Sequence, residues 1–521
     1  MIDKSLPIGI QDFETIRSEN FHYVDKTALI WRLVDDGRYY FLSRPRRFGK
    51  SLLVSTLKAL FEGRRSLFEG LAIYELWDWS TMYPVVRLSF GGKYTEPKAI
   101  ERSILVQLKA IERKTGLSPA TWQTAPEYLL DVVDRLHHLT EQRVVILIDE
   151  YDKPILDNLS ALDLACANRE YLRSIYGVIK DSAEHLRFVF VTGVSMFSNV
   201  SLFSDLNNLE DISLDPKFAK LCGYTDADID TVFASELKGL DRDEIRAWYN
   251  GYNWLGEERV YNPFDVLLLL RSRKFKPYWF RTGSPRFLFE TLKAKSVNTL
   301  DLEGCLADES LVSKFEVEDI SAEALLFQTG YLTITDEQSD GFDVLYRLDY
   351  PNKEVQISLN RELLHYFGKT VTAATNQGRA LCDLLEANDF DGFAEKFRAY
   401  LASIPYQWTT AGNLSRYEAW YAGLLHMCFR AIGVDVRSEE ASSRGRADMV
   451  VLTGGQVFVL EFKMAESINA VETALAATLK QIRERHYAAK YKDRREPIHL
   501  VAIACGRADH ELLRVQAERA G

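Results

Sequence analysis

The chain has 521 residues, of which 47% are hydrophobic and 27% are charged, and its formal net charge at pH 7 is −11. This length is too great for one compact core and predicts about two to four domains. The longest apolar runs, such as 144–148 and 188–191, are only as long as a strand, which excludes membrane-spanning helices of about 20 residues. The acidic balance does not favour nucleic-acid binding by the chain as a whole, although a local basic groove can still contact phosphates.

The N-terminus and the cysteines both give information about the cellular compartment of the protein. Residues 1–7 carry an acid where a signal peptide carries basic residues, and no apolar stretch follows. The cysteines are scattered singly without C-x-x-C spacing, which argues against zinc sites and a disulfide scaffold and fits a reducing compartment. We therefore expect a cytoplasmic location. The six cysteines are Cys166, Cys222, Cys305, Cys382, Cys428 and Cys505.

The first part of the chain alternates strand-like and helix-like segments. Four short β-rich runs lie at 39–43, 84–90, 143–149 and 187–192, and they are almost continuously apolar. Continuous apolar runs are typical of strands that are buried on both faces of a parallel sheet. Helical patterns such as 51–61 and 99–114 lie between them. The sequence therefore predicts an α/β domain with a parallel sheet over residues 1–215.

A phosphate-binding pattern follows the first of these runs. Residues 44–51 read RPRRFGKS, which keeps Gly49, Lys50 and Ser51 of the pattern G-x-x-x-x-G-K-[ST] but has Arg44 in place of the first glycine. In this pattern the lysine reaches the β- and γ-phosphates, the serine binds Mg²⁺, and the following helix presents its positive end to the anion. The structural alternative is a helix start with a solvated lysine.

A second signal of the same chemistry ends the third apolar run. Asp149 closes the run VVILID and Glu150 follows it. An aspartate here can hold Mg²⁺ through water, and the glutamate can polarise the attacking water. The structural alternative is a strand whose last residue caps a turn. The order of these signals, with Thr192 ending the next run, fits the triphosphatases that place an extra strand between the two motifs, and Thr192 would then sense the γ-phosphate.

The basic residues of the loop have two interpretations of equal weight. Arg44, Arg46 and Arg47 concentrate positive charge beside Lys50. They either contact phosphate and stabilise the transition state, or they form a solvated basic turn.

Residues 216–410 have a different texture. Charged, helix-favouring segments dominate, for example 227–240, 319–328 and 380–404. A short strand pair is expected at 330–336 and 342–348. We interpret this part as a mostly helical middle domain with a possible winged-helix-like element.

The last part, residues 411–521, predicts a separate domain with the order α-β-β-β-α-β. In the run QVFVLEFK, alternate residues share a face, so Glu461 and Lys463 point the same way. Asp448 lies upstream across a turn at 453–455, and a hairpin of that length brings it beside Glu461. Two carboxylates suit Mg²⁺ or Mn²⁺, and the lysine can orient or activate a water. The structural alternative is an exposed hairpin with an ordinary Glu–Lys pair.

Other residues can support this site. Glu418, on the preceding helix, is a candidate metal ligand or water-orienting group, and Gln481 lies on the following helix. Arg444 and Arg446 can touch a nucleic-acid backbone, although a basic loop needs no such role. The segment 480–495 is basic with interleaved tyrosines, which permits phosphate contact, but a solvated helix is the commoner outcome.

These motifs together resemble a known family. SRPRRFGKS, VVILIDEYDKPI, FVFVTGVSMFS, LNNLEDIS, YNGYNW with YNPF, and GRADMV with EFK occur in order over nearly the whole chain. They are similar to those of bacterial AAA-ATPase-like proteins with a C-terminal PD-(D/E)XK nuclease-superfamily domain, a restriction-endonuclease-like α/β fold. Arginine in place of the first glycine is itself typical of that family.

The resemblance implies two sites. ATP and Mg²⁺ would bind at Lys50, Ser51, Asp149 and Glu150. A nuclease site would comprise Asp448, Glu461 and Lys463, with Glu418 and Gln481 in support. The leading hypothesis is a metal-dependent nuclease of DNA or RNA that is regulated by ATP.

The alternative hypothesis is a nucleotide-switched scaffold or signalling protein whose nuclease-like domain binds nucleic acid or a partner without cleaving it. A third possibility is that the first domain binds ATP and hydrolyses it negligibly. Homo-oligomerisation is left open by the sequence, and Arg281 and Arg286 are the candidates for a trans-acting arginine.

Overall fold

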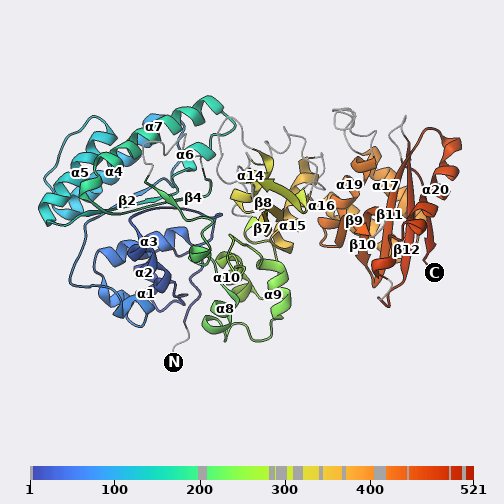
Figure 1. Cartoon of the computed structure of the whole chain (residues 1–521), viewed down its shortest axis with the longest axis horizontal. Helices are drawn as coiled ribbons and strands as arrows, with labels where there is room; N and C mark the ends of the chain where they lie inside the picture. Colours follow the sequence, from blue (N-terminus) through green and yellow to red (C-terminus); the bar gives the residue numbers. More distant parts are fainter. Residues whose placement is uncertain are drawn as a thin grey trace. The chain divides into compact units, whose positions relative to one another are not determined.

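The protein is described by a computed structural model, which divides into two compact units (Figure 1). The first comprises Met1–Leu292 and Gly304–Glu354, and the second comprises Lys293–Glu303 and Val355–Gly521. The segment 216–410, expected as a middle domain, is therefore divided between them. The described residues are 4–196, 208–280, 288, 302–308, 321–339, 344–366, 371–403, 418–442, 445–491, 494–506 and 512–520.

A five-stranded parallel sheet forms the centre of the first unit, as the sequence predicts. Its order is β2-β3-β4-β1-β5, so β4 lies between β1 and β3. This confirms the expected extra strand between the two phosphate-chemistry motifs. Nearly every position of β3 and β4 is buried, which explains why these runs are continuously apolar. The strands are β1 Tyr39–Ser43, β2 Val85–Ser89, β3 Val144–Asp149, β4 Leu186–Gly193 and β5 Glu210–Asp211.

Helices cover both faces of this sheet. In Figure 1, α4, α5 and α7 lie on one side and α1, α2 and α3 on the other. Within the described ranges, no helix is both long and apolar enough to cross a membrane. The helices are α1 Phe13–Ser18, α2 Thr27–Asp36, α3 Lys50–Phe61, α4 Pro97–Thr115, α5 Ala125–Thr140, α6 Lys153–Leu156 and α7 Leu162–Asp181, with 3-10 turns at Arg65–Phe68, Ala72–Glu75 and Ala183–His185.

The rest of the first unit combines helices with a small antiparallel sheet of order β6-β8-β7. The predicted strand pair is present as β7 and β8, whereas β6 and α10 were not predicted. The elements are α8 Asp226–Val232, α9 Arg242–Tyr249, α10 Pro263–Ser272, β6 Cys305–Asp308, α14 Ala322–Thr329, β7 Thr333–Ser339 and β8 Val344–Asp349, with a 3-10 turn at Pro216–Phe218. Apolar side chains of α8, α9 and α10 share one core.

A mixed sheet of order β13-β12-β11-β10-β9 forms the centre of the second unit. Only β11 and β12 pair in parallel, because α20 connects them. The predicted α-β-β-β-α-β order is present, and β13 adds an edge strand that was not predicted. The elements are α15 Lys353–Tyr366, α16 Val371–Glu386, α17 Phe390–Ala402, α19 Glu418–Arg430, β9 Asp435–Ser442, β10 Gly445–Thr453, β11 Gln456–Ala465, α20 Val471–Glu484, β12 Ile498–Gly506 and β13 Leu512–Arg519, with 3-10 turns at Ile468–Ala470 and Ala489–Tyr491.

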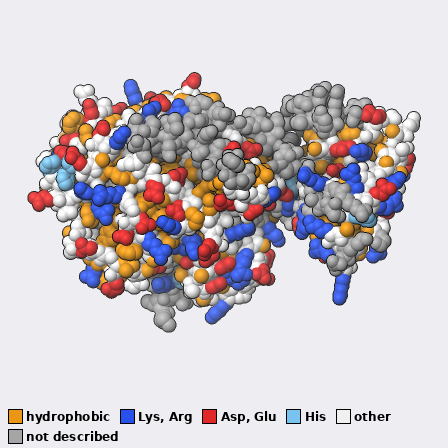
Figure 2. Space-filling view, in the orientation of Figure 1, with side chains coloured by type: hydrophobic (Ala, Val, Ile, Leu, Met, Phe, Trp, Pro, Cys, Tyr) orange, Lys and Arg blue, Asp and Glu red, His pale blue; other side chains and the backbone are white. Residues whose placement is uncertain are grey.

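The surface carries both charge signs. On the face drawn in Figure 2, basic and acidic side chains are interspersed over the described parts of both units. The net charge of −11 is therefore spread rather than gathered into one acidic area on this face. All six cysteines lie in described residues, and none of them forms a disulfide.

Candidate functional sites in the two units

The phosphate-loop pattern lies between β1 and α3. Gly49 has φ +95°, a left-handed conformation that glycine adopts at no steric cost, and it immediately precedes α3. Arg47 has φ +69°, which is uncommon for a residue with a side chain. This turn places Lys50 and Ser51 in the first turn of α3, where unpaired backbone N–H groups favour anions.

Lys50 is held by the carbonyl groups of its own loop. Its Nζ donates to Arg44 O at 2.7 Å and to Pro45 O at 2.8 Å, and the residue is 7% exposed. Burial lowers the pKa of Lys50, and the charges of Asp152 and Asp149 oppose this shift. An ammonium group has three N–H donors, so one can still point to a bound phosphate.

Arg44 has a structural role that neither interpretation of the basic loop anticipated. It is fully buried, and its guanidinium donates to Ser43 O and Ser213 O, both at 2.8 Å. The group also lies 4.1 Å from the centre of the Trp254 ring. Arg44 does not line the pocket described below, so it fastens the loop to the protein interior instead of contacting phosphate.

The acidic motif lies at the carboxyl end of β3. Asp149 is 2% exposed, and its buried Oδ1 has no hydrogen-bond partner. Its Oδ2 lies 3.7 Å from the guanidinium of Arg87 on β2. An unpartnered buried carboxylate oxygen is costly, and a bound cation relieves that cost. The donor set of Asp149 with Ser51 therefore fits a magnesium ion.

Glu150 has the features of a catalytic base. It has φ +55°, a strained conformation of the kind that gathers at functional sites. Burial and the charge of Asp149 raise the pKa of Glu150, while Lys50 opposes the shift. A raised pKa suits a carboxylate that accepts a proton from water.

Thr192 lies beside Asp149 in the sheet register, but its hydroxyl donates to Leu42 O at 2.7 Å. It is fully buried and does not line the pocket. Its role as a γ-phosphate sensor stays a prediction.

Sequence reasoning missed Asp152. Its Oδ2 accepts hydrogen bonds from Val194 N at 2.8 Å, Ser195 N at 2.6 Å and Ser195 Oγ at 2.7 Å. It thereby fastens the turn after β3 to the turn after β4, and it also lines the pocket. Asp152 is part of the run VVILIDEYDKPI, two residues after Glu150, and this position was the sequence signal that could have identified it as a site residue.

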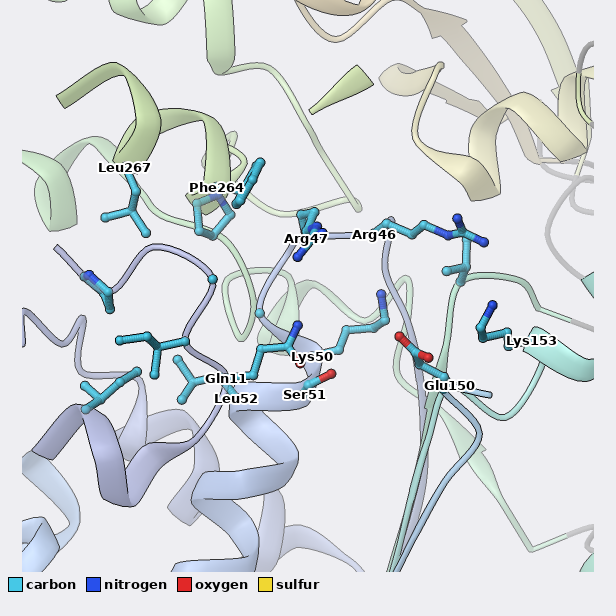
Figure 3. Close-up of a pocket in the computed structure, with 18 of the residues that line it drawn as sticks. Gln11, Arg46, Arg47, Lys50, Ser51, Leu52, Glu150, Lys153, Phe264 and Leu267 are labelled. Atoms are coloured by element: carbon cyan, nitrogen blue, oxygen red, sulfur yellow. The ribbon is translucent and has the colours of Figure 1, made fainter. Parts of the chain in front are cut away.

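Lys50, Ser51, Glu150 and Asp152 line a pocket of about 400 Å³ (Figure 3), whereas Arg44, Asp149 and Thr192 do not. One end is charged and the other is mostly apolar, and the two ends suit the phosphates and the nucleoside of a nucleotide, respectively. Figure 3 shows Lys50, Ser51 and Glu150 near the centre, with Phe264 and Leu267 of α10 on the side away from Glu150. The charged lining comprises Arg46, Arg47, Lys50, Glu150, Asp152 and Lys153, and the other lining includes Pro7, Ile10, Gln11, Tyr224, Phe264 and Leu267.

The nuclease-like motif of the second unit occupies the hairpin of β10 and β11. Met449 is paired with Leu460, and the N–H of Asp448 donates to Glu461 Oε2 at 3.2 Å. The carboxylate of Asp448 accepts the N–H of Phe462 at 2.7 Å. The predicted approach of Asp448 to Glu461 is therefore present in the structure.

Gln481 of α20 also contacts the carboxylate of Glu461. Its Nε2 donates to Glu461 Oε1 at 2.7 Å. Glu461 is 6% exposed, and burial together with the charge of Asp448 raises its pKa to about 8. A cation would relieve the repulsion between the two carboxylates.

Lys463 and Glu418 form an ion pair whose charges both act on Glu461. Lys463 Nζ is 3.3 Å from Glu418 Oε1, and the same oxygen accepts the N–H of Met464 at 3.1 Å. The charge of Glu418 also raises the pKa of Glu461. The lysine is about half exposed, so it can reach a bound substrate or water.

Asp448 and Glu461 supply oxygen donors of the type that Mg²⁺ and Mn²⁺ prefer. In the described part of the chain, however, no three His, Cys, Asp or Glu side chains converge to form a metal site. Two carboxylates with water completing the coordination thus fit the geometry, and Glu418 is occupied by Lys463 and Met464. Arg446 is exposed, whereas Arg444, Arg281 and Arg286 lie outside the described residues.

Comparisons with known proteins agree with the expected N-terminal ATPase-like domain and the expected C-terminal nuclease-superfamily domain. A family described as "Predicted AAA-ATPase" matches residues 7–203, and one described as "PD-(D/E)XK nuclease superfamily" matches residues 416–512. The chain is 48% identical over 523 residues, covering 100% of both chains, to an "Uncharacterized protein in vnfD 5'region" of Azotobacter chroococcum mcd 1. No solved structure matches. The chain therefore belongs to the family of AAA-ATPase-like proteins that carry a C-terminal PD-(D/E)XK nuclease-superfamily domain.

Proposed function

We propose that the first unit binds and hydrolyses ATP with Mg²⁺, and that the second unit hydrolyses phosphodiester bonds of DNA or RNA under the control of that nucleotide. The observation that carries the proposal is that each unit brings its own acid pair into proximity with a lysine. In the first unit these are Asp149, Glu150 and Lys50, and in the second Asp448, Glu461 and Lys463.

In the first unit, the charged end of the pocket would hold the triphosphate. Lys50 and Arg46 line this end and would neutralise the phosphate oxygens, while the Arg47 guanidinium lies 4.9 Å from the centre of the Phe264 ring. Magnesium held by Ser51 and Asp149 would supply further charge stabilisation to the phosphates. Glu150 would accept the proton of the attacking water, for which its raised pKa suits it.

In the second unit, Asp448 and Glu461 would hold the metal, with Gln481 fixing the orientation of the Glu461 carboxylate. A divalent ion there would stabilise the charge on the scissile phosphate. Lys463 would orient or activate the water, and its ion pair with Glu418 of α19 would hold its ammonium group in place.

A second candidate function has its own observation. Because no three ligating side chains converge in the described residues, the second unit could bind nucleic acid or a partner without cleaving it. The chain would then be a nucleotide-switched scaffold. A thermal shift with Mn²⁺ in the wild type, absent in Asp448→Asn, would favour the nuclease, because only a bound ligand stabilises the folded state in this way.

The deciding experiment is cleavage of labelled single- and double-stranded DNA and RNA with Mg²⁺ or Mn²⁺, with and without ATP. The variants are Lys50→Ala, Asp448→Asn and, as a matched control lysine, Lys109→Ala, whose side chain is exposed on α4 of the first unit. Cutting that is lost in Asp448→Asn, and that responds to ATP only when Lys50 is present, supports the proposal. Cutting that survives in Asp448→Asn refutes the nuclease assignment.

We further propose that the chain works in the cytoplasm and that its partner is nucleic acid. The absence of disulfides among the six cysteines is compatible with a reducing compartment. Assembly into a homo-oligomer is a prediction that sedimentation with and without ATP would check.

A further inference from the structure

The backbone of the phosphate loop accepts a hydrogen bond from Trp279, a residue that is distant in the sequence. The indole Nε1 of Trp279 donates to Arg46 O at 3.0 Å, across a separation of 233 residues. Trp279 is 1% exposed. With Lys50 bonded to Arg44 O and Pro45 O, three consecutive carbonyl groups of the loop are bonded to donors.

This bond determines how one peptide group of the loop is oriented. In a trans peptide, the C=O of one residue and the N–H of the next point in opposite directions. No peptide bond in the described residues is cis, so fixing Arg46 O also fixes the direction of the Arg47 N–H. Arg46 and Arg47 both line the pocket, with the Arg47 guanidinium 4.9 Å from the centre of the Phe264 ring, and the backbone N–H groups of such a loop bind phosphate oxygens.

Trp279 is itself held in place from two sides. Its backbone N–H donates to Glu354 Oε1 at 2.8 Å, and Glu354 is 1% exposed. On the other side, a β-carbon added at Gly330 would lie 2.6 Å from Pro45 and 3.5 Å from the Trp279 ring. Only glycine therefore permits this close packing, and the indole has little freedom to leave Arg46 O.

Glu354 connects this arrangement to two further elements. It is the second residue of α15 and the last residue of the first compact unit. Its buried neighbour is Asp265 of α10, the helix that contributes Phe264 and Leu267 to the apolar end of the pocket. Burial raises the pKa of both carboxyl groups, so the pair retains a proton where isolated carboxyls would be ionised.

We propose that Trp279, held by Glu354, is a positioning residue of the phosphate loop: it orients the Arg46–Arg47 peptide toward the phosphates and couples nucleotide occupancy to the first turn of α15. This inference rests on the proposed binding of ATP in the pocket. In the usual pattern the first glycine lets the loop backbone curl around the phosphates. Here Arg44 replaces that glycine, and residues outside the loop orient the backbone instead. The first turn of α15 is the segment that responds to nucleotide occupancy.

The first test compares ATP with adenosine. Trp279→Phe removes the indole donor and keeps an aromatic ring, so ATP should bind about fivefold more weakly, whereas adenosine, which lacks phosphates, should bind as before. Trp248→Phe, a partly buried tryptophan of α9 in the same unit, is the matched control and should change neither affinity. Equal weakening of ATP and adenosine, or weakening of neither, would overturn the proposal.

The second test concerns Glu354. Glu354→Gln keeps an oxygen acceptor for the Trp279 N–H and should bind ATP within about twofold of the wild type, while Glu354→Ala should lose about as much as Trp279→Phe. Combining Glu354→Ala with Trp279→Phe should add little further loss, because both changes break one connection. Fully additive losses would show that the two residues act separately, against the proposal.

Hydrogen exchange of the wild-type chain tests the coupling without any substitution. ATP should slow exchange in peptides covering 276–280 and 353–358, with α4 as the reference helix. Unchanged exchange in both peptides while ATP is bound would overturn the coupling. If titration of the wild type shows no ATP binding at all, the proposed function fails, and this inference falls with it.

Discussion

Replacing Arg44 by glycine would restore the usual phosphate-loop pattern, yet we expect it to damage the protein. The guanidinium is fully buried and donates to Ser43 O and Ser213 O at 2.8 Å while lying against Trp254. Arg44→Gly removes these contacts and also adds backbone freedom to the loop.

The expected loss in the free energy of unfolding follows from contributions of opposite sign. Two hydrogen bonds from a charged donor contribute about 3–6 kcal/mol, and a desolvated cation–π contact about 2 kcal/mol. Burial, which lowers the pKa of Arg44 to about 10, costs roughly 3 kcal/mol of this. The added freedom of glycine costs about 0.5–1 kcal/mol more. We therefore expect a net loss of roughly 2.5–6 kcal/mol in the stability of the first unit.

Denaturant unfolding and ATP titration of Arg44→Gly measure this prediction. Arg44→Lys should lie between the variant and the wild type, because a lysine keeps the charge but not the forked donor geometry. Arg32→Ala, an exposed change in α2, should stay within about 0.5 kcal/mol. An Arg44→Gly variant that is as stable as the wild type and binds ATP as tightly would refute the reasoning.

Three further predictions concern other parts of the chain. Asp448→Asn should reduce cleavage of labelled nucleic acid by at least about 100-fold, because a metal-holding carboxylate is lost, and should leave phosphate release from ATP unchanged. Burial raises the pKa of Asp265 to about 7, so the stability that its protonated form contributes is greatest below about pH 4 and is lost as pH rises through 7. Urea unfolding at pH 5 and pH 8 should show most of this loss, up to about 3 kcal/mol, and Asp265→Asn should reduce it; a profile that Asp265→Asn leaves unaltered would contradict the assignment. Gly330→Ala should cost about 1–3 kcal/mol in the same assay, because φ is +89° and the added carbon meets Pro45, and an unchanged midpoint would count against that packing.

Much of the fold could be predicted because its signals are local. The apolar runs of β1 to β4 and of β10 to β12 are buried strands, and the shared face of Glu461 and Lys463 on β11 stays a prediction from strand geometry. The hairpin length predicted that Asp448 lies beside Glu461, and the hydrogen bond from Asp448 N to Glu461 is present. Strands β6 and β13 and helices α10 and α15 were missed because their patterns are short or mixed.

The assignment of residues 216–410 to the two units was harder to predict from the sequence than the individual elements were. Residues 216–410 have one texture in sequence, but helices α16 and α17 pack in the second unit while α8, α9 and α10 share a core in the first. Composition describes each segment separately and does not record which partner covers its apolar face.

The order of most elements and the family could be predicted from the sequence alone, as could the chemistries that we propose and the residues proposed to carry them, because such signals depend on neighbours along the chain. The contacts of Arg44, Asp152, Trp279 and Glu354, in contrast, could be read only from the folded chain. Each of these bonds joins groups that lie 42 to 233 residues apart, so the environment that gives the side chain its role exists only after the chain has folded.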